Sequence, residues 1–305
     1  MPTNEVSVVK SLRIQSVFYG NKKADVEYSL IHLLNAIKIA RSLSLFSSVT
    51  VAFGDCSSAP IFSQEEINAK YYEAQKSGVD SIVYEYFDAN LGSAGGHNRL
   101  LKNLHEDYVL ILNPDTVVSP DIFAELLLPF SDPAVAAVEA KQIPIEHPKD
   151  YAESTGETGW ISTACALVRS SAVKAVNGFD SNTFFLYCDD VDFSWRLRLL
   201  GYKLIFQSTA AIFHDKRLSI DGGWIAGEAE RYHAALAAML LTYKYSRNDL
   251  TKRIQADLAL NGDTLQQKAA ADFKIKQEDG RLPSQIDTEH RVAEFINGVY
   301  TSHRF

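Results

Sequence analysis

The sequence predicts an α/β fold with a mostly parallel central sheet and helices on both of its faces. Apolar, β-branched runs at 13–19, 49–53, 81–87 and 108–112 alternate with helical patterns at 25–45, 63–77 and 95–105. This alternation is typical of parallel sheets built from crossover units. With 305 residues and 46% hydrophobic content, the chain is long enough for one large α/β domain and a smaller appended one.

The remaining elements follow in chain order. Ser63 and Glu66 have capping-box spacing at the start of the second helix, and Ser119 followed by Pro120 marks another helix start. A further apolar run at 134–143 leads into a long polar loop at 144–158, which we expect beside the active site. Residues 160–178 predict a buried segment and a short helix that ends at Gly178, before a helix from about 190 and a strand near 203.

The last part of the chain has helical patterns at 225–246, 248–260, 263–277 and 287–300. We therefore expect a catalytic domain over residues 1–223 and an α-helical region over 224–305. The apolar stretch HAALAAMLLTY in the first of these helices fits packing against the catalytic domain or a second copy of the chain. A helix at a membrane surface is the alternative, although the acidic Glu228 and Glu230 argue against deep insertion.

Bulk charge and the distribution of apolar residues exclude several classes of function. The net charge of −8 offers no basic field for a nucleic-acid backbone. Residues 1–12 do not resemble a secretory signal, and no apolar run approaches the roughly 20 residues that span a bilayer. We expect a cytoplasmic protein, with peripheral contact at the inner face of the membrane left open. Its three widely spaced cysteines, Cys56, Cys165 and Cys188, are expected to be reduced.

Polar side chains follow each of the first four predicted strands. These are Tyr19 with Asn21, then Asp55, then Asn90, then Asn113 with Asp115. Ligands of open α/β sheets bind beyond the carboxyl ends of the strands. These side chains are therefore expected to line one binding cleft.

The segment NLGSAGGHN at 90–98 is a glycine-rich turn between a strand and a helix. Glycines let a backbone approach a ligand closely, and a helix N-terminus offers free N–H donors to an anion. The turn can therefore hold a phosphate or a sugar, although an ordinary tight turn has the same composition.

Carboxylates and one histidine supply the candidate chemistry. Asp115 can bind the Mg²⁺ or Mn²⁺ that a nucleotide diphosphate needs, or it can cap the helix near Ser119. Asp189, Asp190 and Asp192 place three carboxylates within four residues, which suggests a general base or a metal site. Helix capping accounts for one or two of them. His214 follows a predicted edge strand, where a surface or core role is the simpler explanation.

Taken together, these segments resemble the rhamnosyltransferase-like and galactofuranosyltransferase-like members of the inverting family 2 glycosyltransferases, which have the Rossmann-like GT-A fold. The resemblance covers about residues 12–220, and it is strongest at 90–118 and 163–206. It implies transfer of a sugar from a nucleotide diphosphate, with dTDP-rhamnose or a UDP-hexose favoured, to a hydroxyl of a glycan or lipid-linked glycan. The expected setting is the synthesis of a cell-surface polysaccharide such as O-antigen or capsule.

The resemblance also implies roles for the donor side of the cleft. Asp55 would contact the nucleobase or ribose, while Asn90 and Gly92 would lie beside the diphosphate or sugar. Asp115 would bind the metal together with His214. The donor-binding set is Tyr19, Asp55, Asn90, Gly92, Asn98, Asn113 and Asp115. Asn113 stands where the family often has the first aspartate of a D-x-D pattern, so only Asp115 would bring charge to the metal.

On the acceptor side, the resemblance makes Asp190 the catalytic base. Asp189 stands where relatives often have glutamate, and it would orient the acceptor or the base. Trp160 and Thr163 would line the acceptor site together with Asp189. The helical region leaves open a homo-oligomer.

Three rival functions remain. A dinucleotide-binding oxidoreductase would explain the glycine turn followed by Asp115, but the glycine order is wrong and the turn follows the third strand instead of the first. A sugar nucleotidyltransferase would need a basic glycine-rich loop near the N-terminus. A non-catalytic protein that binds nucleotides or glycans could keep the fold, although Asp115, Asp190 and His214 are all present.

Overall fold

The computed structural model describes residues 10–147, 149–214 and 227–296. Its strands are β1 (Lys10–Phe18), β2 (Phe46–Asp55), β3 (Ser81–Tyr86), β4 (Tyr108–Leu112), β5 (Thr116–Val118), β6 (Val135–Ile143), β7 (Cys165–Arg169) and β8 (Lys203–His214). Its helices are α1 (Lys23–Ser42), α2 (Gln64–Gln75), α3 (Gly92–Leu101), α4 (Ile122–Leu127), the 3-10 helix η1 (Leu128–Ser131), α5 (Ser170–Ala175), α6 (Asp189–Leu199), α7 (Glu228–Lys244), α8 (Asn248–Asn261) and α9 (Thr264–Glu278).

All these strands join one sheet in the order β3-β2-β1-β4-β7-β6-β8-β5. The half formed by β3, β2, β1 and β4 is parallel, as the alternating pattern predicts. The other half is mixed, because β7 runs antiparallel to both β4 and β6, and β5 runs antiparallel to β8. An apolar run predicts a strand but carries no information on its direction, so this part of the topology could not be predicted.

Helices cover both faces of the sheet, and β4 shows how its alternate residues divide between them. Tyr108, Leu110 and Leu112 belong to the core under α1, α2 and α4. Val109 and Ile111 belong to the core that α5 and α6 complete on the other face. Successive side chains of a strand point to opposite faces, so a fully apolar run matches a strand buried on both sides.

Most of the predicted elements are present with small changes at their ends. The Ser63–Glu66 capping box is formed, and Gly178 closes the turn after α5 with φ +69°. The helix expected near Ser119 begins later, at Ile122, without a side-chain cap.

The helix predicted over 287–300 is wrong for its described part, 287–296, which contains no helix. The carboxylate of Asp287 accepts hydrogen bonds from the backbone N–H groups of Arg291, Val292 and Ala293. These donors would otherwise begin helical bonding, so the segment forms a loop that packs against Trp195 of α6 through Val292 and Ala293.

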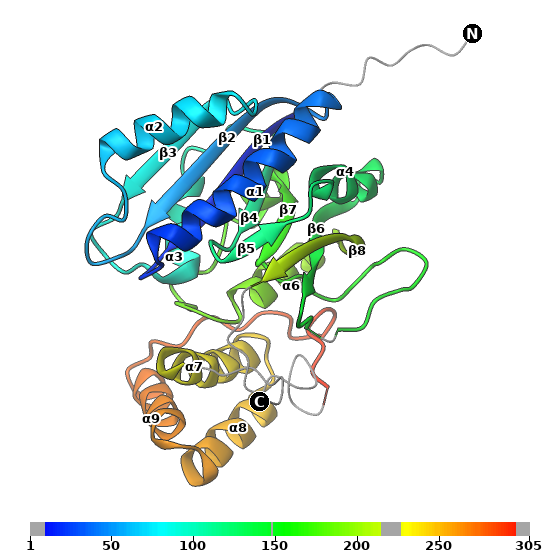
Figure 1. Cartoon of the computed structure of the whole chain (residues 1–305). Helices are drawn as coiled ribbons and strands as arrows, with labels where there is room; N and C mark the ends of the chain where they lie inside the picture. Colours follow the sequence, from blue (N-terminus) through cyan, green and yellow to red (C-terminus); the bar gives the residue numbers. More distant parts are fainter. Residues whose placement is uncertain (1–9, 148, 215–226, 297–305) are drawn as a thin grey trace.

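Helices α7, α8 and α9 form a group below the sheet in the view of Figure 1. Ala235, Met239 and Leu241 of α7 are buried in a core shared with α9 and with Val191 and Trp195 of α6. The apolar stretch of α7 is therefore covered by this chain itself. The expected domain boundary at 223/224 lies outside the described residues. No helix in the described ranges is long and apolar enough to cross a membrane.

Candidate functional site

Asp55 lies at the carboxyl ends of β1 and β2, and it is fully buried. Its carboxylate accepts hydrogen bonds from the backbone N–H of Ser57 (2.9 Å) and of Ile61 (2.8 Å), and from the Tyr84 hydroxyl (2.5 Å). Burial and the bond to Asp55 raise the pKa of Tyr84, which therefore stays protonated as a donor. Asp55 thus shapes the loop at 56–61, whereas Tyr19 at the end of β1 is exposed.

The glycine-rich turn fits its surroundings only with glycine at Gly92. Gly92 has φ +67°, and a Cβ there would lie 2.2 Å from the carbonyl oxygen of Phe185. Asn90 accepts a hydrogen bond from the Gly92 N–H through its Oδ1 (3.1 Å), and the Ser93 N–H donates to the Phe185 carbonyl (3.0 Å). The turn is therefore held against the segment that leads into α6.

Asn98 joins α3 to that same segment. Its Nδ2 donates to the Phe179 carbonyl (2.7 Å), and its Oδ1 accepts from the Phe179 N–H (2.8 Å). These paired bonds give Asn98 a structural role, and its contact with a donor stays a prediction.

Asp115 and His214 come together from the end of β4 and the end of β8. Their Oδ1 and Nε2 atoms are 3.4 Å apart, and the Asn113 Nδ2 lies 3.5 Å from the same His214 nitrogen. The other ring nitrogen, Nδ1, is 2.8 Å from the Oε1 of buried Gln142. An amide oxygen only accepts, so Nδ1 carries the hydrogen that is donated to Gln142, and Nε2 is the nitrogen that faces Asp115.

This pair suits a divalent cation that is shared with a ligand. Asp115 is 40% exposed, so a cation bound to it could also reach phosphate oxygens. A histidine whose second nitrogen is fixed by an amide is a typical metal ligand. Across the described ranges no group of three or more His, Cys, Asp or Glu residues could hold a metal. A cation held by Asp115 and His214 alone would take its remaining ligands from a phosphate and water.

The three aspartates of α6 have different surroundings. Asp192 is paired with Arg196 (2.8 Å) and Lys244 (2.5 Å), so it joins α6 to α7. Asp189 is buried beside Asp190, and its Oδ2 has no hydrogen-bond partner among the residues that the structure describes. Burial, followed by the charge of Asp190, raises the pKa of Asp189, which an interaction with the Ser93 side chain partly offsets.

The backbone that leads into α6 is unusual. Tyr187 and Cys188 both have positive φ, +68° and +57°. Such conformations are costly for residues other than glycine and concentrate at functional sites. They turn the chain sharply so that Asp189 and Asp190 begin the helix.

The segment 160–164 connects the two sides of the site. The Asn113 N–H donates to the Ala164 carbonyl (2.9 Å), and the Ser194 hydroxyl bonds both the Ile161 N–H (3.1 Å) and the Asp190 carbonyl (2.7 Å). The loop that holds Asn113 and Asp115 is therefore linked to α6 through this short buried segment.

Trp160, which the sequence analysis expects to line an acceptor site, is buried, and its contact with an acceptor stays a prediction. Trp160 is 4% exposed, and the Lys149 ammonium lies 3.9 Å from its ring centroid. Lys149 also pairs with buried Glu139, whose pKa burial raises to about 7. Trp160 and Lys149 thus anchor the loop at 144–158. Thr163 is also almost fully buried, and its contact with an acceptor stays a prediction.

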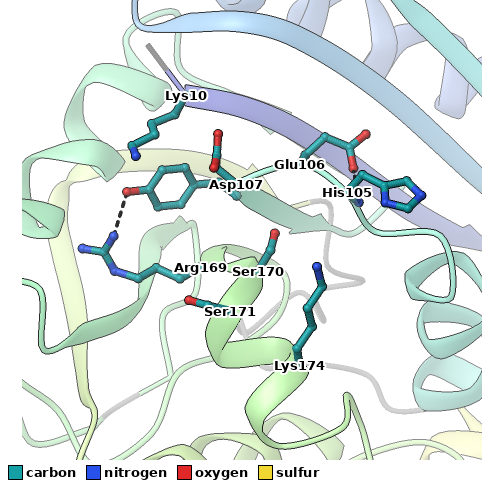
Figure 2. A pocket seen from close by; sticks show the side chains of 9 residues that line it. Lys10, His105, Glu106, Asp107, Arg169, Ser170, Ser171 and Lys174 are labelled. Carbon is teal, nitrogen blue, oxygen red and sulfur yellow. Dashed lines mark hydrogen bonds between the residues drawn. The ribbon is translucent and has the colours of Figure 1, made fainter. Parts of the chain in front are cut away.

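A polar cavity of about 340 Å³ lies at the opposite end of the strands. Figure 2 shows Lys174 and Ser170 pointing into it and Arg169 bonded to the Tyr108 hydroxyl. Its walls include Lys10 and Tyr108, which begin β1 and β4, so it is separate from the carboxyl ends of these strands. It contains none of the site residues predicted from the sequence.

Sequence reasoning missed Gln142, Ser93 and Phe185. Ser93 lies inside the glycine-rich motif and Phe185 inside the apolar run before Asp189, so both were within segments already singled out. Gln142 offers no signal in the sequence, because only the pairing of β6 with β8 brings it to His214.

Three curated relatives share parts of the sequence. N-acetylglucosaminyl-diphospho-decaprenol L-rhamnosyltransferase of Mycobacterium tuberculosis is 41% identical over 58 residues, 19% of each chain. Pre-mycofactocin glycosyltransferase of the same species is 28% identical over 157 residues, 45% of this chain and 33% of that protein. Rhamnosyltransferase WbbL of Escherichia coli K12 is 29% identical over 147 residues, 37% of this chain and 55% of that protein. The matches thus span about a fifth to about half of these relatives, and no family model matches the chain.

Two solved structures share the architecture over most of the chain. Mannosyltransferase PcManGT of Pyrobaculum calidifontis, in complex with GDP-Man and Mn²⁺, has a TM-score of 0.59 at 16% identity, covering 89% of this chain and 76% of its own. GalNAc-T7 with UDP, GalNAc and Mn²⁺ has a TM-score of 0.61 at 11% identity, covering 94% and 57%. At these identities the likeness shows the fold. The chain has the GT-A fold of glycosyltransferases, which confirms the predicted fold class.

Proposed function

We propose that this chain is an inverting glycosyltransferase that uses a divalent cation to transfer a sugar from a nucleotide diphosphate to a hydroxyl of a glycan. The observation that carries the proposal is the arrangement of Asp115 with His214 on one side of the segment at 160–164 and of Asp189 with Asp190 on the other. Sugar transfer needs charge stabilisation at the leaving group and a base at the acceptor. The glycosyltransferase relatives and the GT-A fold support the same reaction class.

The donor side uses the polar rim. We infer that the nucleoside lies near the loop at 56–61, which Asp55 holds in place through its three hydrogen bonds. Exposed Tyr19 borders this loop, because the Gly20 N–H donates to the Ser57 hydroxyl (3.2 Å). The diphosphate would lie near Asn90 and Gly92, at the turn that the contact between Gly92 and Phe185 holds in place.

Asp115 and His214 would hold the cation, Mn²⁺ or Mg²⁺, and the Asn113 amide would remain beside them. When bound, the cation neutralises charge that develops on the departing diphosphate. His214 is oriented for this role because Gln142 fixes its Nδ1 nitrogen and leaves Nε2 facing Asp115. The Mn²⁺ in both structural neighbours supports this assignment.

Asp190 would act as the base. Its carboxylate removes the proton from the acceptor hydroxyl as that oxygen forms a bond to the anomeric carbon. The bond from this carbon to the diphosphate oxygen breaks on the opposite face, so the configuration inverts. Asp189, whose pKa is raised, would carry a proton for much of the neutral range and could donate a hydrogen bond to the acceptor or to Asp190.

The named relatives guide the choice of substrates. Two of the three are rhamnosyltransferases, so we propose dTDP-rhamnose as the first donor to test, followed by UDP-hexoses. The acceptor we propose is a glycan or lipid-linked glycan of a cell-surface polysaccharide, since the name of one relative contains N-acetylglucosaminyl-diphospho-decaprenol.

A thermal-shift titration with UDP, dTDP, GDP and NAD, each with and without Mn²⁺, tests the proposal. A ligand that binds only the native state raises the transition temperature. We expect a manganese-dependent rise with one nucleoside diphosphate, absent in His214→Ala. A manganese-independent rise with NAD alone would overturn the proposal in favour of an oxidoreductase.

A further inference from the structure

Phe185 presents an aromatic ring beside the turn that faces Asp189. It is 37% exposed, whereas its neighbour Phe184 is fully buried in the core shared with α7. The Phe185 carbonyl accepts the Ser93 N–H and lies against Gly92, so its backbone is fixed. Ser93 also interacts with Asp189 through its side chain. The exposed ring is therefore attached to the turn that contacts the acidic pair.

His233 of α7 lies against this ring. The two ring centroids are 4.9 Å apart and the planes differ by 31°. His233 also makes an edge contact with Tyr232, with ring centroids 5.0 Å apart. The Tyr232 hydroxyl donates to Asp272 of α9 (2.7 Å), and Lys268 lies 4.6 Å from the Tyr232 ring centroid. Contacts of Tyr232 with α9 therefore hold His233 of α7 in place beside Phe185.

A partly exposed aromatic side chain beside the turn that contacts Asp189 suits a sugar ring. One face of a pyranose consists mainly of C–H groups, which pack against the negative face of an aromatic ring. The hydroxyls at the rim of the sugar remain free to bond polar groups such as Asp189 and Asp190. Aromatic side chains combined with a few polar groups are typical of small-molecule sites.

We propose that the Phe185 ring, with His233 packed against it, forms a platform that binds a pyranose ring of the acceptor. The pair lies on the Asp189 side of the site, which we assign to the acceptor, so this inference rests on the proposed function. It gives the C-terminal helices a role in acceptor recognition, because His233 and its supports come from α7 and α9.

Saturation-transfer NMR with octyl N-acetyl-β-D-glucosaminide tests the platform on the full chain. We expect transfer to the pyranose ring protons in the parent protein. Phe185→Ala should raise the dissociation constant about tenfold, while Phe185→Trp retains binding. His233→Ala should weaken binding and His233→Phe should restore it. Tyr72→Ala, which removes a 65% exposed aromatic side chain on α2, is the matched control and should bind like the parent.

Three results would overturn the platform. They are no transfer to the parent at millimolar probe, transfer confined to the octyl chain, and equal binding by the parent and Phe185→Ala. The manganese-dependent thermal shift with a nucleoside diphosphate separates this failure from that of the proposed function. If that shift persists without sugar binding, only the platform is wrong, and if both are absent, the transferase proposal fails as well.

Discussion

Asp189 and Asp192 lie about one turn apart on α6 and are both buried, at 5% and 0% exposure, yet their electrostatic surroundings are opposite. Asp192 has two cations and the Tyr245 hydroxyl (3.2 Å) around it. Asp189 has another carboxylate beside it and an oxygen without a hydrogen-bond partner. Burial alone therefore does not separate a structural carboxylate from one available for chemistry. The partners of each carboxylate separate them, because a paired charge stabilises the fold and an unpaired one is retained at a cost.

The largest loss of stability is expected when the ion pairs around Asp192 are broken. Lys244→Met would leave the carboxylates of Asp192 and Asp180 without their shared cation, and losing one partner of a buried pair costs about 3–5 kcal/mol. Denaturant unfolding measures this loss. Lys203→Met, which breaks an exposed pair with Asp132, is the control and should cost less than about 1 kcal/mol. Equal effects of the two changes would show that the buried network is not structural.

The turn that faces Asp189 can be disturbed at Gly92. Gly92→Ala should lower the free energy of unfolding by about 1–3 kcal/mol through positive φ and should push Phe185 away as well. Gly20→Ala has the same φ, +66°, but no atom within 4 Å of the new Cβ. Unfolding of the two variants separates backbone strain from displacement of Phe185. A smaller loss in Gly92→Ala than in Gly20→Ala would contradict the close contact.

At the proposed metal site, His214 is held by the neutral side chain of Gln142 instead of by an ion pair. Gln142→Leu would remove the acceptor that fixes the His214 tautomer, and loss of such a group typically lowers metal affinity about 10–100-fold. Electron paramagnetic resonance of Mn²⁺ with bound nucleoside diphosphate measures that affinity directly. Gln142→Glu keeps an acceptor at this position and should retain binding. Unchanged Mn²⁺ affinity in Gln142→Leu would remove Gln142 from the site.

Asp189 itself is expected to show its effect as a dependence of stability on pH. Because its pKa is raised to about 7 in the folded state, the folded chain holds a proton that the unfolded chain has lost. Stability is therefore lost as pH rises from the ordinary carboxyl range through the folded pKa. Asp189→Asn removes this loss, so its melting temperature should exceed that of the parent more at pH 8 than at pH 5. The same difference at both pH values would contradict a raised pKa.

The sequence predicted the parallel half of the sheet and the helices that cover it, because apolar periodicity is a local property. It also singled out the segments of the candidate site, since the glycine turn and the aspartate cluster are each contiguous. The mixed half of the sheet and the role of Gln142 depend on pairings between distant strands. The loop at 287–296 carries a helical pattern, but the Asp287 carboxylate takes its backbone donors. The burial of Trp160 could not be predicted either, because it depends on contacts with Lys149, His147 and the core shared with α7.

The most direct test of the account compares nucleotide binding and sugar transfer in Asp190→Asn. The donor is a nucleotide sugar that contains the nucleoside diphosphate identified by the thermal shift. The acceptor is octyl N-acetyl-β-D-glucosaminide. We expect the manganese-dependent shift to persist while release of the nucleoside diphosphate by transfer falls about 10²–10⁴-fold, the usual contribution of a general base. Transfer at the parental rate in Asp190→Asn would contradict the assignment of this carboxylate as the base.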